Sequence, residues 1–147
     1  MPHEYRYRRR LHFAETDSAG VAHFSQYMRF AEEAEHAFLR SLGTTVHRHH
    51  GDHALGFPRG AVRFEFFRPI RFEEEFDVVV RVRRIGRNSL TYEFVFGRDD
   101  ELIAHGEFTV ICCRVYSDGR IESVELPPEL VELLEESPDP PISYRSG

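Results

Sequence analysis

The sequence predicts an α+β fold in which a long central helix is wrapped by a curved five-stranded antiparallel sheet, with a short helix near the C-terminus. Two patterns favour this architecture. Residues 24–42 place apolar side chains at the three- and four-residue spacing of an amphipathic helix. Residues 61–116 form short runs rich in Val, Phe, Ile and Tyr that are separated by turn residues, which is typical of an antiparallel meander. Such a sheet needs an apolar layer over one face, and the apolar stripe of the helix supplies it.

The composition fits a single domain over residues 1–147. Hydrophobic residues make up 41% of the chain and aromatic residues 13%, which argues against disorder. The net charge of -6 gives no reason to expect nucleic-acid binding. No apolar run reaches the length of a membrane span and the first ten residues lack the apolar segment of a signal peptide, so we expect a cytoplasmic protein without a membrane partner. Cys112 and Cys113 are neighbours, so we expect buried free thiols rather than a disulfide.

The chain begins with a predicted strand over residues 5–14, which leads through an acidic turn into the long helix. We expect Ser25 to cap the N-terminus of this helix and Gly43 to end it, since glycine adopts the left-handed conformation at low cost. The apolar stripe consists of Phe24, Tyr27, Met28, Ala31, Ala34, Phe38 and Leu42.

Residues 44–59 have no regular period and several glycines and prolines, so we expect a loop. Imidazole is a common zinc or nickel ligand, and this loop contains His47, His49, His50 and His53. Their spacing matches no standard zinc pattern, and only Asp52 adds a nearby acid. We therefore expect no metal here, but a solvated loop or the rim of a substrate site.

Four further strands are predicted at residues 61–68, 75–85, 89–98 and 102–116. Turn residues at 86–88 and at Asp99 and Asp100 join three of them as hairpins. Residues 127–136 open with prolines that favour a helix start, and we expect a short helix there. The proline-rich residues 138–147 are expected to form a flexible tail.

Asp17 lies a few residues before the helix, across a tight turn. A helix N-terminus presents unpaired N–H groups that can polarise a carbonyl and hold the oxyanion formed when it is attacked. The amides of His23 and Phe24 are the candidates for this role, and Asp17 is the candidate base or nucleophile. The alternative is that Asp17 only stabilises its own turn, as aspartates commonly do.

The stretch from Thr16 to Gly43 resembles the signature of hotdog-fold acyl-CoA thioesterases of the 4-hydroxybenzoyl-CoA thioesterase type. In that family a D-x-x-G turn precedes a helix bearing an N-Y or Q-Y pair. The matching residues are Asp17, Gly20, Val21, Gln26 and Tyr27. The resemblance implies a hotdog fold, Asp17 as the catalytic carboxylate, an acyl-CoA substrate, and no cofactor or metal beyond the coenzyme A of the substrate. Many relatives have His-Ala-Asn-Tyr at the helix start, whereas this chain has its histidine one place earlier, at His23.

The resemblance also implies that the segment before the S-L-T-Y strand lies near the coenzyme A phosphates. Guanidinium groups match phosphates with two-pronged hydrogen bonds, so the candidates are Arg84, Arg87, Asn88 and Ser89. Solvated arginines at a hairpin tip are the alternative. A homodimer or homotetramer is implied as well, with two sheets joined edge to edge and the active site at the interface. Pairing through an edge also removes exposed backbone groups from each sheet.

Hydrolysis of an acyl-CoA thioester is therefore the leading hypothesis, with Asp17 attacking the carbonyl or activating water. One enzymatic alternative gives the active role to a helix carboxylate, Glu32 or Glu35, although solvent-facing ion pairs explain both more simply. A dehydratase using His23 and His36 lacks a matching signature. The alternative from another class is a non-catalytic module that senses acyl-CoA. The acyl group is not determined, because the phenylalanines that could line a pocket are more often core residues; they are Phe24, Phe57, Phe64, Phe66 and Phe67.

Overall fold

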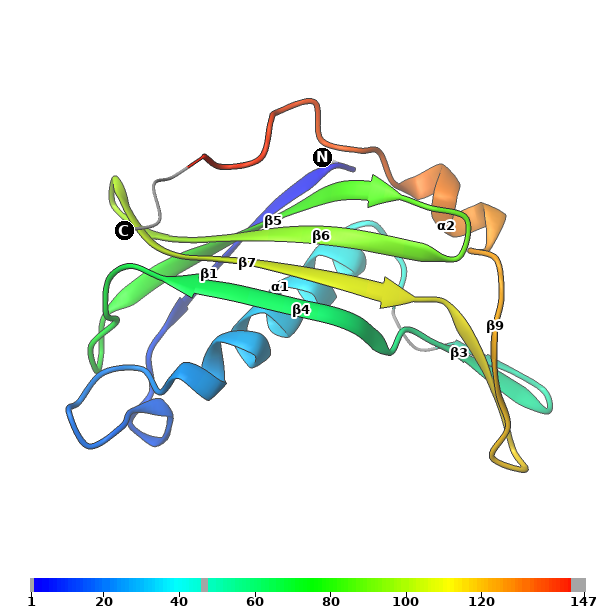
Figure 1. Cartoon of the computed structure of the whole chain (residues 1–147), viewed down its shortest axis with the longest axis horizontal. Coiled ribbons are helices and arrows are strands. Elements are labelled where there is room, and N and C mark those ends of the chain that lie inside the picture. Colours follow the sequence, from blue (N-terminus) through cyan, green and yellow to red (C-terminus); the bar gives the residue numbers. More distant parts are fainter. Residues whose placement is uncertain (1, 46–47, 144–147) are drawn as a thin grey trace.

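A computed structural model describes residues 2–45 and 48–143. One long helix lies against the concave face of a curved sheet, and a smaller sheet extends from one end of it (Figure 1). The elements are β1 (Glu4–Arg10), η1 (Phe13–Glu15), η2 (Phe24–Gln26), α1 (Tyr27–Ser41), β2 (Arg48–His50), β3 (His53–Gly56), β4 (Arg59–Phe66), β5 (Glu75–Ile85), β6 (Ser89–Arg98), β7 (Glu101–Ile111), β8 (Cys113–Tyr116), β9 (Ile121–Ser123) and α2 (Pro128–Leu133).

The main sheet has five antiparallel strands in the order β1-β5-β6-β7-β4, which confirms the predicted architecture. β5 and β6 have the predicted bounds, because both are rich in apolar residues that recur at alternate positions and both end at turn residues. β1 ends at Arg10, earlier than predicted, since the chain then turns into the short helix η1. The predicted strand 102–116 is interrupted at Cys112, where β7 passes into β8 of the smaller sheet.

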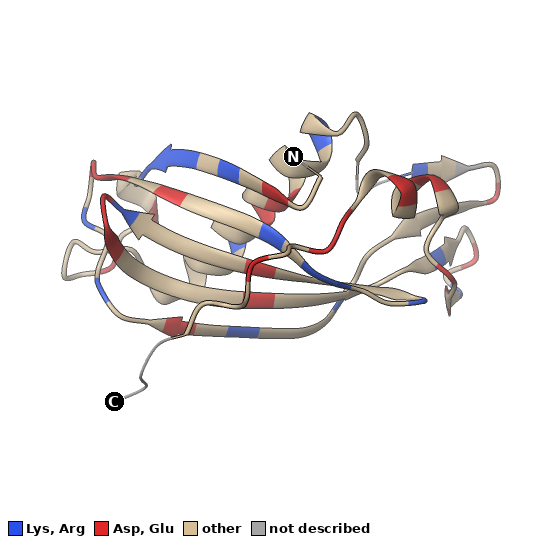
Figure 2. Cartoon of the chain, turned by 90° about the horizontal axis from the view of Figure 1, so that it is seen from above, with Lys and Arg blue, Asp and Glu red and all other residues tan. Residues whose placement is uncertain are grey.

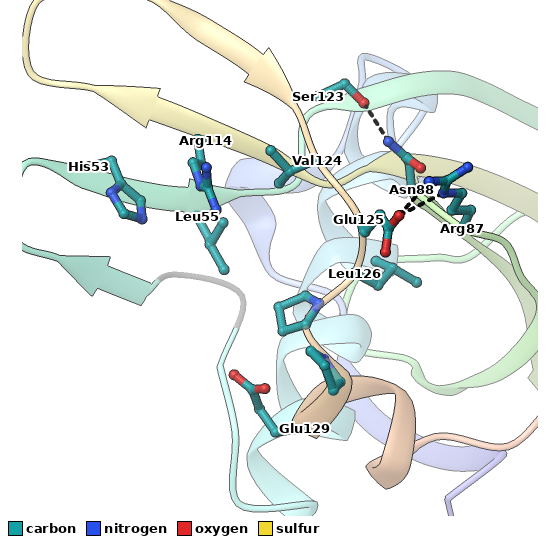
Figure 3. Close-up of a pocket in the computed structure, with 12 residues that line it drawn as sticks. His53, Leu55, Arg87, Asn88, Arg114, Ser123, Val124, Glu125, Leu126 and Glu129 are labelled. Carbon is teal, nitrogen blue, oxygen red and sulfur yellow. Dashed lines mark hydrogen bonds and ion pairs between the residues drawn. The ribbon is translucent and has the colours of Figure 1, made fainter.

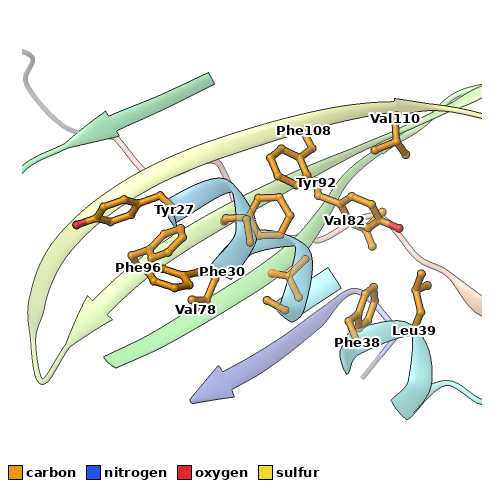
Figure 4. Packing of buried hydrophobic residues seen from close by; sticks show 14 of the residues in the cluster. Tyr27, Phe30, Phe38, Leu39, Val78, Val82, Tyr92, Phe96, Phe108 and Val110 are labelled. Atoms are coloured by element: carbon orange, nitrogen blue, oxygen red, sulfur yellow. The ribbon is translucent and has the colours of Figure 1, made fainter. Parts of the chain in front are cut away.

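The core lies between α1 and the concave face of the main sheet (Figure 4). The helix contributes Phe30 and Phe38, and the sheet contributes Phe94, Phe96 and Phe108, all nearly free of solvent contact. These rings meet edge-on or tilted, as between Phe94 and Phe108, whose centroids lie 4.8 Å apart. Burial of this apolar face holds the helix across the sheet and fixes where its N-terminus lies.

The two ends of α1 differ in how well the sequence predicts them. Gly43 has a positive φ of 81°, which confirms it as the residue that ends the helix. The predicted cap at Ser25 is wrong. A turn of 3-10 helix, η2, precedes α1, and its cap is His23, whose Nδ1 accepts from the Ser25 amide at 3.2 Å and lies 2.7 Å from Ser25 Oγ.

The prediction of a loop over residues 44–59 is also wrong for its described part. β2 and β3 form a hairpin whose β3 strand pairs with β8, and β8 pairs with β9, making a four-stranded sheet. His47 and the side chain of His50 lie outside the described residues. Among the described residues, no group of three His, Cys, Asp or Glu side chains is placed to hold a metal ion.

The face of the main sheet away from α1 is charged near β1 and covered near β6. Arginines 6, 8 and 10 of β1 pair with Glu75 and Asp77 of β5, and Figure 2 shows these blue and red positions side by side. The chain after α2 runs over the same face, where the Ser137 amide donates to Val82 O at 2.8 Å and the Ile142 amide donates to Glu93 Oε2 at 2.9 Å. No helix within residues 2–45 or 48–143 is long and apolar enough to cross a membrane.

Cys112 and Cys113 are both buried and free, as the sequence predicts.

Candidate active site

Asp17 begins a tight turn that the chain closes with backbone hydrogen bonds. The Asp17 amide donates to Val21 O at 2.8 Å, and the Gly20 amide donates to Asp17 O at 3.0 Å. Gly20 has a positive φ of 78°, a conformation that glycine adopts without strain. One carboxylate oxygen, Oδ1, accepts from the Ala19 amide at 2.8 Å. Asp17 therefore does stabilise its own turn through Oδ1. Its other oxygen, Oδ2, has no hydrogen bond or ion pair within the described chain.

The amides at the helix start are not all unpaired. The His23 amide donates to Glu15 O at 2.9 Å, so the expectation that it is an available donor is wrong. The Ser25 amide donates to the His23 ring and the Gln26 amide donates to His23 O. Phe24 is the first residue of η2, so its amide has no partner within the helix. No other acceptor for the Phe24 amide occurs among residues 2–45 and 48–143.

Asp17 and Phe24 line one cavity of about 400 Å³. Half of its lining residues are aromatic, and the ring centroids of two of them, Tyr27 and Phe66, lie 4.8 Å apart. Tyr27 is 4% exposed, and this burial raises the pKa of Tyr27 to about 12, with Arg98 opposing the shift and the negative charge of Asp17 adding to it. The phenol therefore stays protonated and remains a hydrogen-bond donor. The complete lining is Asp17, Ala22, Phe24, Tyr27, Phe66, Phe67, Arg68 and Pro69.

A second cavity, of about 770 Å³, is lined by residues of the β5–β6 hairpin, the smaller sheet and α2 (Figure 3). The β5–β6 hairpin and the smaller sheet lie at the end of the main sheet opposite the turn that precedes α1 (Figure 1). Arg87 pairs there with Glu125 at 2.6 Å, and the Asn88 amide group donates to Ser123 Oγ at 3.2 Å. Both members of the ion pair are exposed, with side-chain exposures of 81% and 63%, so solvent screens it and a ligand phosphate can compete for Arg87.

The structure divides the predicted site residues between these two cavities. Asp17, Phe24 and Tyr27 line the first, and Arg87 and Asn88 line the second. The remaining predicted residues line neither cavity. Gly20 and Val21 instead shape the Asp17 turn, Gln26 ends η2, and Arg84 and Ser89 flank the hairpin tip.

Three phenylalanines that the sequence assigns mainly to the core are exposed at the first cavity. Phe24 is 67% exposed, Phe66 48% and Phe67 38%. Phe66 and Phe67 lie at the end of β4, an edge strand, and a strand's place in the sheet is not visible in its own residues. Arg68 and Pro69, which also line the cavity, were missed for the same reason.

The helix carboxylates have structural partners. Arg59 donates to Glu32 at 2.8 Å and to Glu35 at 2.7 Å, and Glu35 is 1% exposed. The ion pairs expected for these residues are confirmed, although Glu35 is buried rather than facing solvent.

A long helix wrapped by an antiparallel sheet, with a carboxylate turn leading into the helix, defines the chain as a hotdog-fold protein. The chain belongs to the thioesterase-like superfamily, whose family model matches residues 11–134. Both the family resemblance and the expected enzyme class, a thioester hydrolase, are confirmed.

Similar proteins have related names. A putative esterase of Aquifex aeolicus is 31% identical over 130 residues, which cover 88% of this chain and 97% of that relative. A 1,4-dihydroxy-2-naphthoyl-CoA hydrolase of Thermosynechococcus vestitus is 27% identical, and the match covers 90% of each protein. The solved structure of a 4-hydroxybenzoyl-CoA thioesterase has a TM-score of 0.76 at 14% identity, covering 90% of this chain and 99% of that one, which is a likeness of fold alone.

Proposed function

We propose that this thioester hydrolase cleaves acyl-CoA, with Asp17 as the reacting carboxylate and the Phe24 amide as the donor to the thioester oxygen. The observation that supports this most is that the free Oδ2 side of Asp17 and the unpaired Phe24 amide belong to residues lining one cavity. A carboxylate and an oxyanion donor around one carbonyl are the groups that acyl transfer to water requires.

Two routes fit these groups. As a base, Asp17 takes a proton from water, the resulting hydroxide adds to the carbonyl carbon, and the Phe24 N–H stabilises the oxyanion. As a nucleophile, Asp17 forms a mixed anhydride that water then hydrolyses. In both routes the C–S bond breaks, the thiolate of coenzyme A leaves and takes up a proton, and a carboxylic acid is released.

We propose an aromatic acyl group as the substrate class. Phe24, Tyr27, Phe66 and Phe67 line the same cavity as Asp17, and aromatic rings favour edge-on or offset contacts with one another. The relatives named 1,4-dihydroxy-2-naphthoyl-CoA hydrolases support the same class. Arg68, which is 56% exposed at this cavity, adds a cation that suits an acyl group with polar ring substituents.

The proposal includes a homodimer joined through the β4 edge. β1, the other edge, has a row of charged arginines that discourages pairing, whereas β4 exposes Val62 and Phe66. Arg59 and Phe66, the ends of β4, lie about 23 Å apart at the usual rise of a strand. Antiparallel pairing of two copies brings the Phe66 end of one β4 beside the Arg59 end of the other.

This pairing brings together the two sets of predicted site residues. Arg59 and Leu90 both pair with Val110, so the start of β4 lies in the same row of the sheet as the β5–β6 hairpin. The hairpin of one copy then faces the Asp17 cavity of its partner, and Arg87 and Asn88 contact the coenzyme A phosphates there. No cofactor beyond coenzyme A itself is proposed, and the free, buried cysteines suit a reducing cytoplasm.

The test is thiol release from a panel of aromatic and aliphatic acyl-CoA substrates by the wild type and Asp17→Asn. The substitution keeps the size of the side chain and removes its charge, so we expect kcat to fall by about a thousandfold or more while the fold is retained. Turnover of the variant within about tenfold of wild type would shift the chemistry to another group.

The finer part of the proposal is that coenzyme A carries the acyl group. Absence of thiol release from every acyl-CoA, by a folded wild type, would shift the substrate to a thioester of another carrier.

A further inference from the structure

Glu15 is a buried carboxylate two residues before Asp17, and no step of the proposed reaction uses it. Only 2% of its surface is exposed. Carboxylates are almost never buried to this extent unless they are paired, so the partners of Glu15 indicate what it does.

These partners come from elements that are far apart in the sequence. Arg9 of β1 donates to Oε1 at 2.8 Å and to Oε2 at 2.9 Å, a two-pronged arrangement that fixes direction as well as distance. Arg29 of α1 donates to Oε2, and the His12 amide donates to Oε1 at 2.8 Å. One carboxylate therefore joins the first strand, the central helix and the start of η1, which leads into the Asp17 turn.

The backbone of Glu15 holds the other side of the same loop. Its carbonyl accepts the His23 amide at 2.9 Å, and an antiparallel bridge between Thr16 and Ala22 follows directly. The loop between these contacts is mostly exposed and contains the flexible Gly20. Because the His23 amide donates to Glu15 O, the first unpaired amide at this helix start is that of Phe24.

We propose that Glu15 is a positioning residue that fixes the Asp17 carboxylate relative to the Phe24 amide. The inference rests on the proposed function of these two groups. Asp17 follows Glu15 by two residues, and Phe24 directly follows His23, whose amide donates to the backbone carbonyl of Glu15. Loss of the charge leaves Arg9 without its main partner and loosens both ends of the loop at once. A displacement of about 1 Å between reacting groups costs on the order of a hundredfold in rate.

Glu15→Gln tests this, with Glu93→Gln as the matched control. Glu93 is equally buried, at 1% exposed, and pairs with His105 at 2.7 Å and Arg83 at 3.3 Å, but it lies on the face of the sheet away from α1. Both variants are assayed at a temperature at which circular dichroism and urea titration find each fully folded. We expect kcat of Glu15→Gln to fall about 10- to 100-fold with KM within about twofold of wild type, and Glu93→Gln to keep both constants. Equal kcat in the two variants overturns the proposal.

A second measurement separates this inference from the proposed function. We expect hydrogen exchange of the His23 amide to accelerate at least about tenfold in Glu15→Gln and to stay at the wild-type rate in Glu93→Gln, because this amide is held by Glu15. Unchanged exchange in Glu15→Gln overturns the positioning role even if activity falls. If the wild type cleaves no acyl-CoA, the proposed function fails, and the exchange rates still decide whether Glu15 orders this loop.

Discussion

At the Phe66 end of β4, a cavity of about 400 Å³ contains a carboxylate oxygen and an amide without partners in the described chain. At the Arg59 end, a cavity nearly twice as large, about 770 Å³, is lined by polar groups such as Arg87 and Glu125 that pair with each other. The smaller cavity, not the larger one, therefore has the unpaired groups that the proposed reaction requires. A reacting site leaves hydrogen-bonding groups for the substrate to complete, whereas a binding surface can use exposed pairs that exchange with a ligand.

The ion pairs at the two ends also differ in how far they are buried. Glu15, next to the Asp17 turn, is buried and contacts Arg9 and Arg29. The Arg87–Glu125 pair at the hairpin is exposed on both sides. The proposed reacting end is therefore next to a buried, multiply paired carboxylate, whereas the ion pair at the hairpin end is open to solvent.

Mixed dimers test most sharply whether the two ends form one site. A dimer of one Asp17→Asn chain and one Arg87→Glu chain, isolated with two affinity tags, contains one site with both defects and one with neither if the ends meet across the interface. We expect such dimers to recover about half of the wild-type kcat/KM at low substrate, since one of two sites is intact. Both variant homodimers serve as controls. If both ends act within one chain, kcat/KM of the mixed dimer stays at or below half of kcat/KM of the Arg87→Glu homodimer.

The features predictable from sequence are those encoded by neighbouring residues. The strands Glu75–Ile85 and Ser89–Arg98 follow from alternation, and the Asp17 turn follows from its aspartate and glycine. The hairpin of β2 and β3 could not be predicted, because the strand that β3 pairs with, β8, lies about sixty residues further along the chain. The exposure of Phe66 likewise depends on its strand being an edge, which only the assembled sheet determines.

The candidate site was predictable only in part for a related reason. The resemblance identifies Asp17 and Tyr27, which share a cavity, and also Arg87, which the structure places at the other end of the sheet. Capping by His23 was missed because a neighbouring serine is the commoner cap. Glu15 gave no local signal, since its importance comes from Arg9 and Arg29 on two other elements.

Removal of Arg87 is expected to change binding and leave the chemistry intact. A charge-assisted hydrogen bond to phosphate contributes about 1.5 kcal/mol or more, so Arg87→Ala should raise KM about tenfold at nearly constant kcat. Arg120→Ala is the matched control, because Arg120 pairs with Asp118 at a similarly exposed position, with side-chain exposures of 70% and 58%, outside both cavities. An equal rise of KM in the control would mean that Arg87 acts only through general attraction of an anion.

The smallest effect concerns stability in acid, where the two ends should differ again. Burial by itself would raise the pKa of Glu15, but the hydrogen bonds from Arg9 and the His12 amide and the charges of Arg9 and Arg29 together lower it. A carboxyl with a lower pKa in the folded state stabilises the protein above its unfolded pKa, about 4.3, and this contribution is lost as the pH falls through the folded value. Glu15→Gln should therefore lower the free energy of unfolding by about 2–4 kcal/mol at neutral pH. That free energy should also fall less steeply with decreasing pH than in the wild type.

Glu125→Gln at the hairpin should leave both the neutral stability and the acid slope unchanged, because its ion pair is screened by solvent. Urea unfolding of the three proteins between pH 3 and pH 7 measures these slopes. Part of the wild-type dependence of stability on pH should remain in Glu15→Gln, because the pKa of Glu93 is also lowered. Burial opposes this shift, but the hydrogen bonds of Glu93 to His105 and to the Ile142 amide outweigh it. Identical slopes for Glu15→Gln and wild type would mean that the buried pair near Asp17 is no more strongly coupled to folding than the exposed pair at the hairpin.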